Sequence, residues 1–350
     1  MLYTIPHSCP TISSRDIKAV SAVLKSGHIA QGKKVAEFER ELTRFLKAKQ
    51  AVATNSGTSA LHLSLLALGV GRGDQVIVPS FVCSALLHAV LYTGARPVVA
   101  DVDEHDFNIS AGDVRKKITS KTKAVIVPHM FGCPADVKAL KKIGIPIIED
   151  CAQAIGAKYL GRKVGTLGDL SIFSFYATKV LTTAEGGMVI SSNLFWLNKI
   201  KDLREYDKKN DFRLRFNYKM SDLQAALGIS QLSQLPQWIE RRRKIAEMYH
   251  RAFSGLGWAL PEEEKGHYHI YYRYVVRLGK QSGRLIEKLR HGGIQCSLPV
   301  SKPLHRYFGK GACPVSDELM TTTCSIPIYP TLTNKQVAFV IRSIKNATAR

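Results

Sequence analysis

The chain has 350 residues, of which 45% are hydrophobic and 22% charged, the composition of a soluble globular protein with room for about two domains. It carries 50 basic and 28 acidic residues, a net charge of +22 that favours anionic partners, while the scatter of the basic residues argues against nucleic acid. The first residues lack a basic segment followed by an apolar one, so we expect a cytoplasmic protein that does not enter membranes.

Two helices are predicted at the start of the chain. Ser13 and Asp16 form an N-cap pair, apolar residues recur at helical spacing up to Leu24, and Gly27 is a stop signal. A second amphipathic pattern follows Gly32.

From residue 51 onwards, short apolar runs alternate with helical patterns. The runs are 51–53, 76–78, 97–99, 124–127, 145–148 and 172–175. Continuous apolar strands separated by helices predict an α/β fold with a mostly parallel central sheet covered on both faces. In such sheets ligands bind beyond the carboxyl ends of the strands.

The last third of the chain has a different character. Helical patterns cover 221–232 and 237–253, and the basic run 241–244 in the second pattern is expected to face water. A strand, a helix and a final helix are then predicted at 271–278, 282–291 and 334–344. We therefore predict a large domain at 1–240 and a smaller C-terminal α+β domain at 241–350.

One lysine stands out in the segment 171–188, SIFSFYATKVLTTAEGGM. Lys179 follows the apolar run 172–175, and no charged residue occurs between it and Glu185. A lysine delivered by a buried strand loses part of its hydration, which favours the neutral amine that Schiff-base chemistry needs. The alternative is an ordinary solvated lysine, so other residues must decide.

An acid lies at the end of the preceding strand. Asp150 follows the run 145–149, and a buried carboxylate there would keep a pyridine nitrogen protonated, as pyridoxal 5'-phosphate (PLP) requires. Gln153 could contact the hydroxyl of the same ring. The alternative for Asp150 is an N-cap of the next helix.

A phosphate site is predicted at residues 55–59, NSGTS, between a strand and a helix. Backbone N–H groups and the helix dipole favour an anion there, although simple helix capping explains the pattern equally well. Ser174 could add a hydroxyl, or it could be an ordinary buried serine. Phosphate site, acid and amine together at the sheet ends predict a PLP site.

The seven cysteines are scattered, with no pair at CxxC spacing. We expect reduced, mostly buried thiols, and neither a disulfide framework nor a metal site.

The motifs SGTSAL, GDQVIVPSFV, EDCAQA, SFYATK with TTAEGGM, NYKMSDLQAALG and SIPIYPTLT follow one another along the chain. In this order the chain closely resembles the fold-type I PLP-dependent aminotransferases of the DegT/DnrJ/StrS group, which act on nucleotide-linked keto sugars. The resemblance covers essentially the whole chain.

The resemblance implies roles for individual residues. Lys179 is the catalytic lysine that binds PLP, Asp150 is the partner of the ring nitrogen, and Gln153 contacts the ring hydroxyl. The phosphate ligands are Gly57, Thr58 and Ser174, together with Asn217 from a neighbouring subunit. A homodimer with shared active sites is implied.

Three positions depart from the family pattern. Cys83 stands where the family places an aromatic ring on the cofactor, and Tyr176 stands where histidine is common. Arg213 and Arg215 precede Asn217, where glycine is frequent. Surface charge is the favoured interpretation of these arginines, with a sugar diphosphate or a donor carboxylate as the alternative ligand.

We therefore predict an aminotransferase that moves an amino group from an amino acid, glutamate by resemblance, to a nucleotide-linked keto sugar and so forms an amino sugar. One alternative is a cyclitol or another ring ketone as acceptor. Another is a non-catalytic basic binding or regulatory protein on the same fold. A dehydratase of this group would have histidine in place of Lys179.

Overall fold

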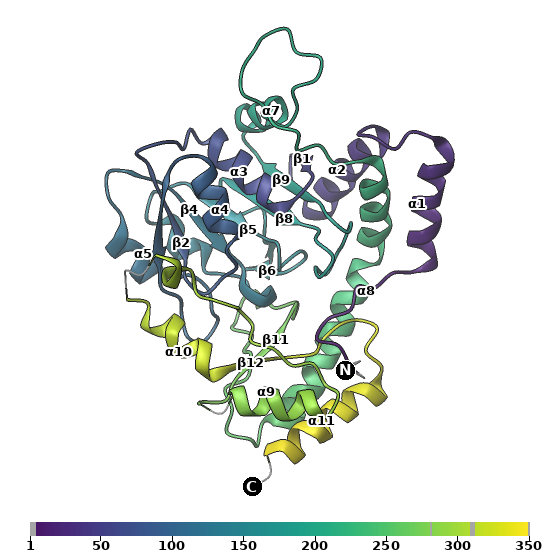
Figure 1. The fold of residues 1–350 in the computed structure, drawn as a ribbon, viewed down its shortest axis with the longest axis vertical. Helices are drawn as coiled ribbons and strands as arrows, with labels where there is room; N and C mark the ends of the chain where they lie inside the picture. The colour runs from purple at the N-terminus through teal and green to yellow at the C-terminus, as the bar shows by residue number, and fades with distance from the viewer. Residues whose placement is uncertain (1–4, 281, 309–311, 349–350) are drawn as a thin grey trace.

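The computed structural model describes residues 5–280, 282–308 and 312–348. A central sheet with helices on both faces forms the upper part of the molecule, and a smaller group of helices and strands lies below it (Figure 1). A long helix, α8, runs from one part to the other.

The central sheet has seven strands in the order β1-β9-β8-β5-β4-β2-β3. The neighbours from β8 to β3 are parallel, whereas β9 is antiparallel to both β8 and β1. The strands are β1 (Gln50–Thr54), β2 (Gln75–Pro79), β3 (Arg96–Ala100), β4 (Thr122–Pro128), β5 (Ile147–Asp150), β8 (Leu170–Ser174) and β9 (Gly187–Ser191). The predicted mostly parallel sheet is confirmed.

Two apolar layers cover the sheet because successive strand residues point to opposite faces. One layer contains α2 (Lys33–Leu46), α5 (Ala111–Lys117), α6 (Val137–Lys141) and the first half of α8 (Asp222–Phe253). The other contains α3 (Gly57–Ala67), α4 (Ala85–Tyr92), α7 (Leu194–Leu203) and part of α10 (Pro314–Thr322).

The lower part has its own core. It is built from the second half of α8, β11 (Tyr274–Arg277), β12 (Thr323–Ile326), α9 (Ser282–His291) and α11 (Asn334–Thr348). Ile5 near the N-terminus also packs in this core, beside Ile294. The remaining elements are β6 (Lys158–Tyr159), β7 (Arg162–Lys163), β10 (His267–Tyr268), and the 3-10 helices at Met130–Gly132 and Leu304–Tyr307.

The two helical patterns at 221–232 and 237–253 form a single helix of 32 residues that contains Pro236. Residue 240, the predicted boundary, lies inside this helix, and a separate core packs against each of its halves. The expectation that the run 241–244 faces water is wrong for Arg242, which is 4% exposed. Its guanidinium donates hydrogen bonds to the carbonyls of Tyr271, Tyr272 and Ile328 at 3.3, 3.1 and 2.9 Å.

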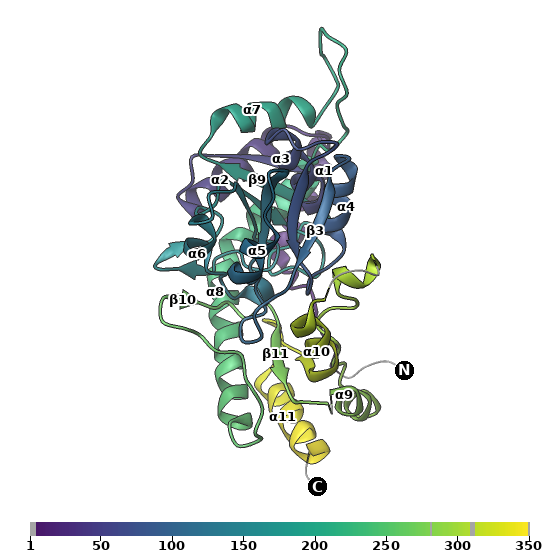
Figure 2. The same cartoon turned by 90° about the vertical axis from the view of Figure 1, so that its left-hand side faces the viewer.

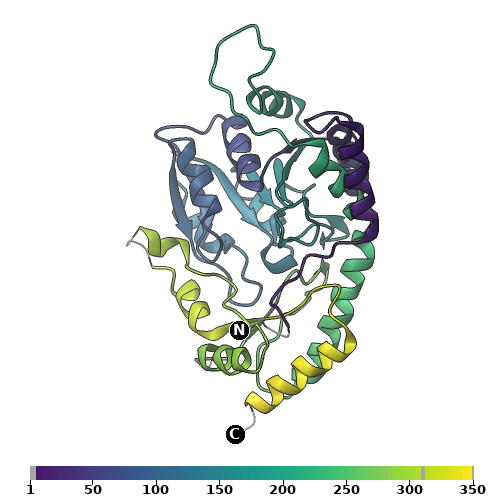
Figure 3. The ribbon, with the colours of Figure 1, turned by 45° about the vertical axis from the view of Figure 1, so that its right-hand side comes forward.

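Helix α1 (Ser14–Ser26) begins and ends where the sequence predicts. Ser13 and Asp16 form a capping box, and Gly27 adopts a left-handed conformation with φ of 73°. The helix lies along α8 (Figure 3). Its predicted apolar stripe is only partly buried, because Ile17 and Leu24 are 62% and 57% exposed.

All seven cysteines are free, and five of them are buried. In the ranges described above, no helix has both the length and the apolar character needed to cross a bilayer.

Candidate active site

Asp150 and Lys179 lie at the same edge of the sheet. Asp150 is the last residue of β5, and β8, which precedes Lys179, runs parallel to β5 with Asp150 opposite Ile172. Asp150 is buried and Lys179 half-buried. Burial raises the pKa of the Asp150 carboxyl, an effect only partly offset by a hydrogen bond from the Ala152 N–H and by the positive charge of Lys179. A buried acid and a half-buried amine therefore lie at the same edge of the sheet.

Cys83 joins this pair. Its thiol is exposed to solvent, yet the protein around it is dense enough that desolvation raises the thiol pKa. The positive charge of Lys179 acts to lower the thiol pKa, and the negative charge of Asp150 acts to raise it.

The start of α3 touches the end of β8. A Cβ atom added to Gly57 would lie 2.7 Å from Cβ of Ser174, so only glycine permits this approach. Ser56 caps the helix by accepting the Ser59 N–H at 3.0 Å. The N–H groups of Gly57 and Thr58 come first in the helix and have no intrahelical acceptor, which makes them free to bind an anion.

Gln153 and Asn217 lie beside this group. The Gln153 side-chain oxygen accepts the Phe131 N–H at 2.9 Å, which fixes the amide in the turn after β5 and leaves its NH₂ group to donate. Asn217 is exposed, and its carbonyl accepts a hydrogen bond from the side chain of Asn55 at 3.3 Å, two residues before α3. Asp150, Gln153, Ser174 and the start of α3 thus lie at one edge of the sheet, and Asn217 lies beside Asn55 of its own chain.

An aromatic residue missed by the sequence analysis faces the lysine. Tyr272 is 6% exposed, and its ring centroid lies 5.5 Å from Nζ of Lys179. Its hydroxyl is 3.4 Å from Oγ1 of Thr178. Arg273, the next residue, places Cζ 5.6 Å from the same ring. The sequence does contain a signal that could have pointed to these two residues, because Arg273 is a charged residue within the aromatic run 271–274.

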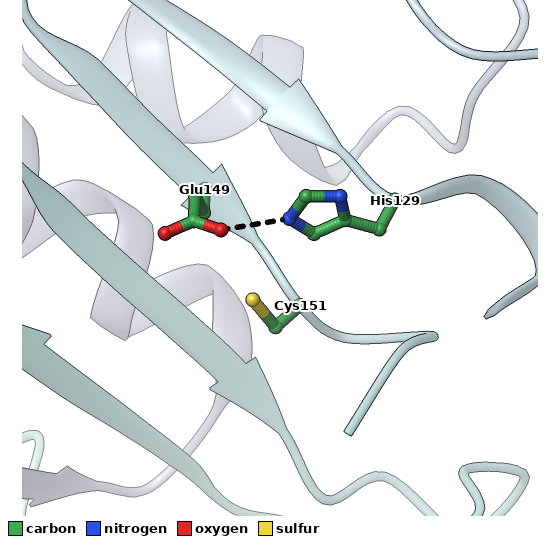
Figure 4. Close-up of side chains that lie close together, drawn as sticks. All are labelled: His129, Glu149 and Cys151. Atoms are coloured by element: carbon green, nitrogen blue, oxygen red, sulfur yellow. Dashed lines mark hydrogen bonds and ion pairs between the residues drawn. The ribbon is translucent and has the colours of Figure 1, made fainter. Parts of the chain in front are cut away.

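A second buried cluster lies directly behind Asp150. Figure 4 shows His129, Glu149 and Cys151, whose potential metal ligands all lie within 4.8 Å of one another. His129 Nδ1 accepts the Ala135 N–H at 2.9 Å, so Nε2 carries the proton and donates it to Glu149 at 3.0 Å.

Glu149 is fully engaged in this cluster. Besides His129 it accepts the N–H groups of Gly165, Leu167 and Gly168 and the hydroxyl of Ser171 at 2.6 to 3.1 Å. Burial acts to raise the pKa of this carboxyl, but the hydrogen bonds outweigh it and the net pKa lies below the usual range. A metal ion would have to displace these bonds, so we interpret the cluster as a structural network that holds β5 in place.

The two arginines before Asn217 are held by acids. Arg215 pairs with Asp202 at 3.1 Å and Asp211 at 2.7 Å, and its side chain is 4% exposed. Arg213 pairs with Asp211 at 2.6 Å. These pairs brace the loop between α7 and α8, which projects beyond the body of the molecule (Figure 2).

The fold is that of fold-type I PLP-dependent enzymes, and the amine, acid and anion site at the sheet edge are the parts that such an enzyme needs. Residues 10–345 match the DegT/DnrJ/EryC1/StrS aminotransferase family. GDP-perosamine synthase of Vibrio cholerae is 34% identical to this chain over 362 residues, which cover 98% of each protein.

Solved structures agree with this match. The aminotransferase TlmJ of Streptoalloteichus hindustanus has a TM-score of 0.93 at 31% identity, with 98% of both chains covered. The PLP form of Spr1654 from Streptococcus pneumoniae has a TM-score of 0.93 at 27% identity, with 99% of both chains covered. The chain therefore belongs to the DegT/DnrJ/EryC1/StrS aminotransferase family and is a PLP-dependent aminotransferase.

The residues described here fit PLP. Gly57 lets the start of α3 lie against Ser174, and the first N–H groups of this helix are available to bind the phosphate. The raised pKa of Asp150 shows a buried carboxyl that a cationic ring nitrogen would satisfy, and Lys179 has no carboxylate within 4.0 Å in the parts of the chain that the structure describes.

Proposed function

We propose that this enzyme transfers an amino group from glutamate to a keto sugar carried on a nucleotide, and so forms an amino sugar. The acceptor class is supported by the full-length similarity to GDP-perosamine synthases of Vibrio cholerae and Escherichia coli O157:H7. The observation that carries the catalytic part is the meeting of Lys179 and Asp150 at one sheet edge. A cyclitol or another ring ketone is the alternative acceptor.

PLP, when bound, supplies a carbonyl group that exchanges amines and a ring that accepts an electron pair. In the proposed mechanism Asp150 holds the proton on the ring nitrogen, and Gln153 donates to the ring hydroxyl. Gly57, Thr58 and Ser174 bind the phosphate. Lys179 Nζ would hold PLP and, as a free amine, would move the proton at the donor α-carbon. Cys83 would help to hold PLP at the position where the family has an aromatic residue.

The test is replacement of Lys179. Lys179→Ala should lose at least about 10³-fold in turnover, because the amine that moves the proton is gone. Thermal unfolding of the variant should stay within a few degrees of the wild type. Substantial transamination by Lys179→Ala would refute the proposed role.

We further propose that the enzyme works in the cytoplasm as a homodimer with shared sites. Exposed apolar side chains support an interface: Phe212 and Leu214 on the projecting loop are 104% and 75% exposed, and Ile17 and Leu24 on α1 add to them. In the proposed dimer Asn217 completes the phosphate site of the partner.

A mixing experiment tests this sharing. Lys179→Ala and Asn217→Ala subunits, each inactive alone, should regain about a quarter of wild-type activity after mixed refolding, because half of the dimers are then hybrids with one intact site. No recovery, despite hybrid dimers detected by a tag, would show that each subunit supplies its own Asn217.

A further inference from the structure

Arg273 and Lys179 flank the same aromatic ring. Cζ of Arg273 lies 5.6 Å and Nζ of Lys179 lies 5.5 Å from the centroid of Tyr272. The positive charges of both side chains lower the pKa of the Tyr272 hydroxyl against the opposing effect of its burial. The guanidinium and the Lys179 amine therefore share one aromatic neighbour, Tyr272.

Arg273 has no acid partner among residues 5–280, 282–308 and 312–348. Arg204, Arg243 and Arg277 are also buried or half-buried, and they contact Glu39, Glu263 and Glu104. Arg242 has no acid partner but donates to three backbone carbonyls. A half-buried guanidinium without a carboxylate has lost water and gained no compensating charge. It is suited to receive an anion from a ligand.

The neighbours of Arg273 position it without neutralising it. Nη1 lies 3.4 Å from Nε2 of His7, whose ring is also 2.8 Å from the hydroxyl of Ser325. Burial and the charge of Arg273 lower the pKa of His7 to about 3, so the ring is neutral at physiological pH. Three segments distant in sequence thus enclose one uncompensated cation.

The backbone at this point is fixed as well. The buried guanidinium of Arg242 binds the carbonyls of Tyr271 and Tyr272, and the Arg273 N–H donates to Phe131 at 3.3 Å. Because Phe131 N–H in turn donates to Gln153, this contact links Arg273 to the turn that follows Asp150. A pre-positioned guanidinium loses little entropy on binding a planar anion.

We propose that Arg273 binds a carboxylate of the amino-acid donor. The inference rests on the proposed function, in which an amino acid and a nucleotide-linked sugar use the site in turn. Both bring anionic oxygens that a guanidinium binds through paired hydrogen bonds. The donor is favoured because its carboxylate lies one bond from the carbon that carries the exchanged nitrogen, whereas the width of the sugar ring separates the diphosphate from the reacting carbon.

The test uses the holoenzyme and follows each half-reaction alone. Glutamate without sugar bleaches the visible absorbance of the bound cofactor, which gives a half-saturation concentration and a maximal rate for the donor. We expect Arg273→Gln to raise the half-saturation concentration for glutamate about 30-fold or more, as for the loss of a paired charged hydrogen bond, with a smaller change in the maximal rate. Arg273→Lys should recover part of this loss.

A binding measurement provides a readout that does not depend on turnover. Glutarate has two carboxylates and no amino group, so its affinity measured by calorimetry should fall in Arg273→Gln by a similar factor. Arg277→Gln is the matched control, since it removes a guanidinium four residues further along the chain whose partner is Glu104. It should leave both glutamate and glutarate binding unchanged.

Three results would overturn the proposal. An increase confined to the half-saturation concentration for the sugar nucleotide would assign Arg273 to the diphosphate. Unchanged constants for both substrates would exclude an anion site, and dissociation into monomers on gel filtration would assign Arg273 to the subunit contact. A wild-type enzyme that glutamate does not bleach would refute the proposed donor instead, so the two failures are distinguishable.

Discussion

Glu149 and Asp150 are adjacent carboxylates on one strand, and their environments are opposite. Glu149 accepts five hydrogen bonds behind the sheet edge and has a lowered pKa, whereas Asp150 accepts one from Ala152 and has a raised pKa. A side chain that the fold satisfies completely stabilises the fold, and one that it leaves incompletely partnered is ready for a ligand. Strand alternation separates these two roles within a single residue step.

The largest expected effect is on activity. Asp150→Asn should reduce turnover by about 10³-fold, because an amide cannot keep the ring nitrogen cationic. The unfolding free energy of the apoenzyme should not fall, since a poorly partnered buried acid contributes no net stability. Steady-state kinetics and urea unfolding measure both quantities. An Asp150→Asn enzyme with full activity would contradict the proposed role of Asp150 at the ring nitrogen.

The matching change behind the sheet should act on stability. Glu149→Gln leaves donors unpaired in a fully buried site and should lower the unfolding free energy by about 3 kcal/mol. Turnover per folded, cofactor-loaded molecule should change much less than in Asp150→Asn. Urea unfolding, with absorbance to count loaded sites, separates the two quantities. A stable but inactive Glu149→Gln enzyme would place Glu149 in the chemistry.

Acid titration should distinguish the two carboxyls by sign. The folded-state pKa of Glu149 is below its ordinary value of 4.5, so its contribution is present above that pH and is lost as the pH falls through the folded pKa. The pKa of Asp150 is above its ordinary 3.8, so its ionisation costs stability at higher pH and the cost disappears on acidification. Melting temperatures should therefore be measured between about pH 6 and 3. As the pH falls, the melting temperature of Glu149→Gln should approach that of the wild type from below, and any excess in the melting temperature of Asp150→Asn should also shrink. A deficit that grows on acidification would contradict the assignment for Glu149.

The smallest effect concerns one donor of the network. Ser171→Ala removes a single hydroxyl that donates to Glu149 at 3.1 Å, while four donors remain. We expect a loss of about 1 kcal/mol in unfolding free energy and unchanged kinetics. Ser174→Ala, three residues further along the chain, should show the reverse, with weaker cofactor retention and unchanged stability of the apoenzyme. If the two variants showed the same cofactor retention and the same unfolding free energy, the two sides of the strand would not have the separate roles assigned to them.

Much of the site was predictable because it depends on local signals. Apolar runs predict strands, parallel strands end at one edge of a sheet, and Lys179 and Asp150 each follow such a run. The same signals could not reveal Tyr272 or Arg273, which lie just before β11, far along the chain from Lys179. Nor could they show that Arg242 is buried, since its three acceptors come from two other segments.

The residue that caps the N-terminus of helix α2 could not be predicted from the sequence. The residue before it, Gly32, has no capping side chain, and the N–H groups of Gly32, Lys34 and Val35 are instead accepted by Asp222 at 2.8, 3.2 and 3.0 Å. Asp222 is the first residue of α8, far along the chain.

The sequence alone determined the order of strands and helices, the mostly parallel sheet and the placement of Lys179 and Asp150 after buried strands, because these follow from periodicity and neighbouring residues. The tertiary structure decided which of two adjacent carboxylates remains available, that Arg273 has no acid partner among the described residues, and which residue caps α2. Each of these depends on donors and acceptors from distant segments, and only the folded chain brings those groups within hydrogen-bonding distance.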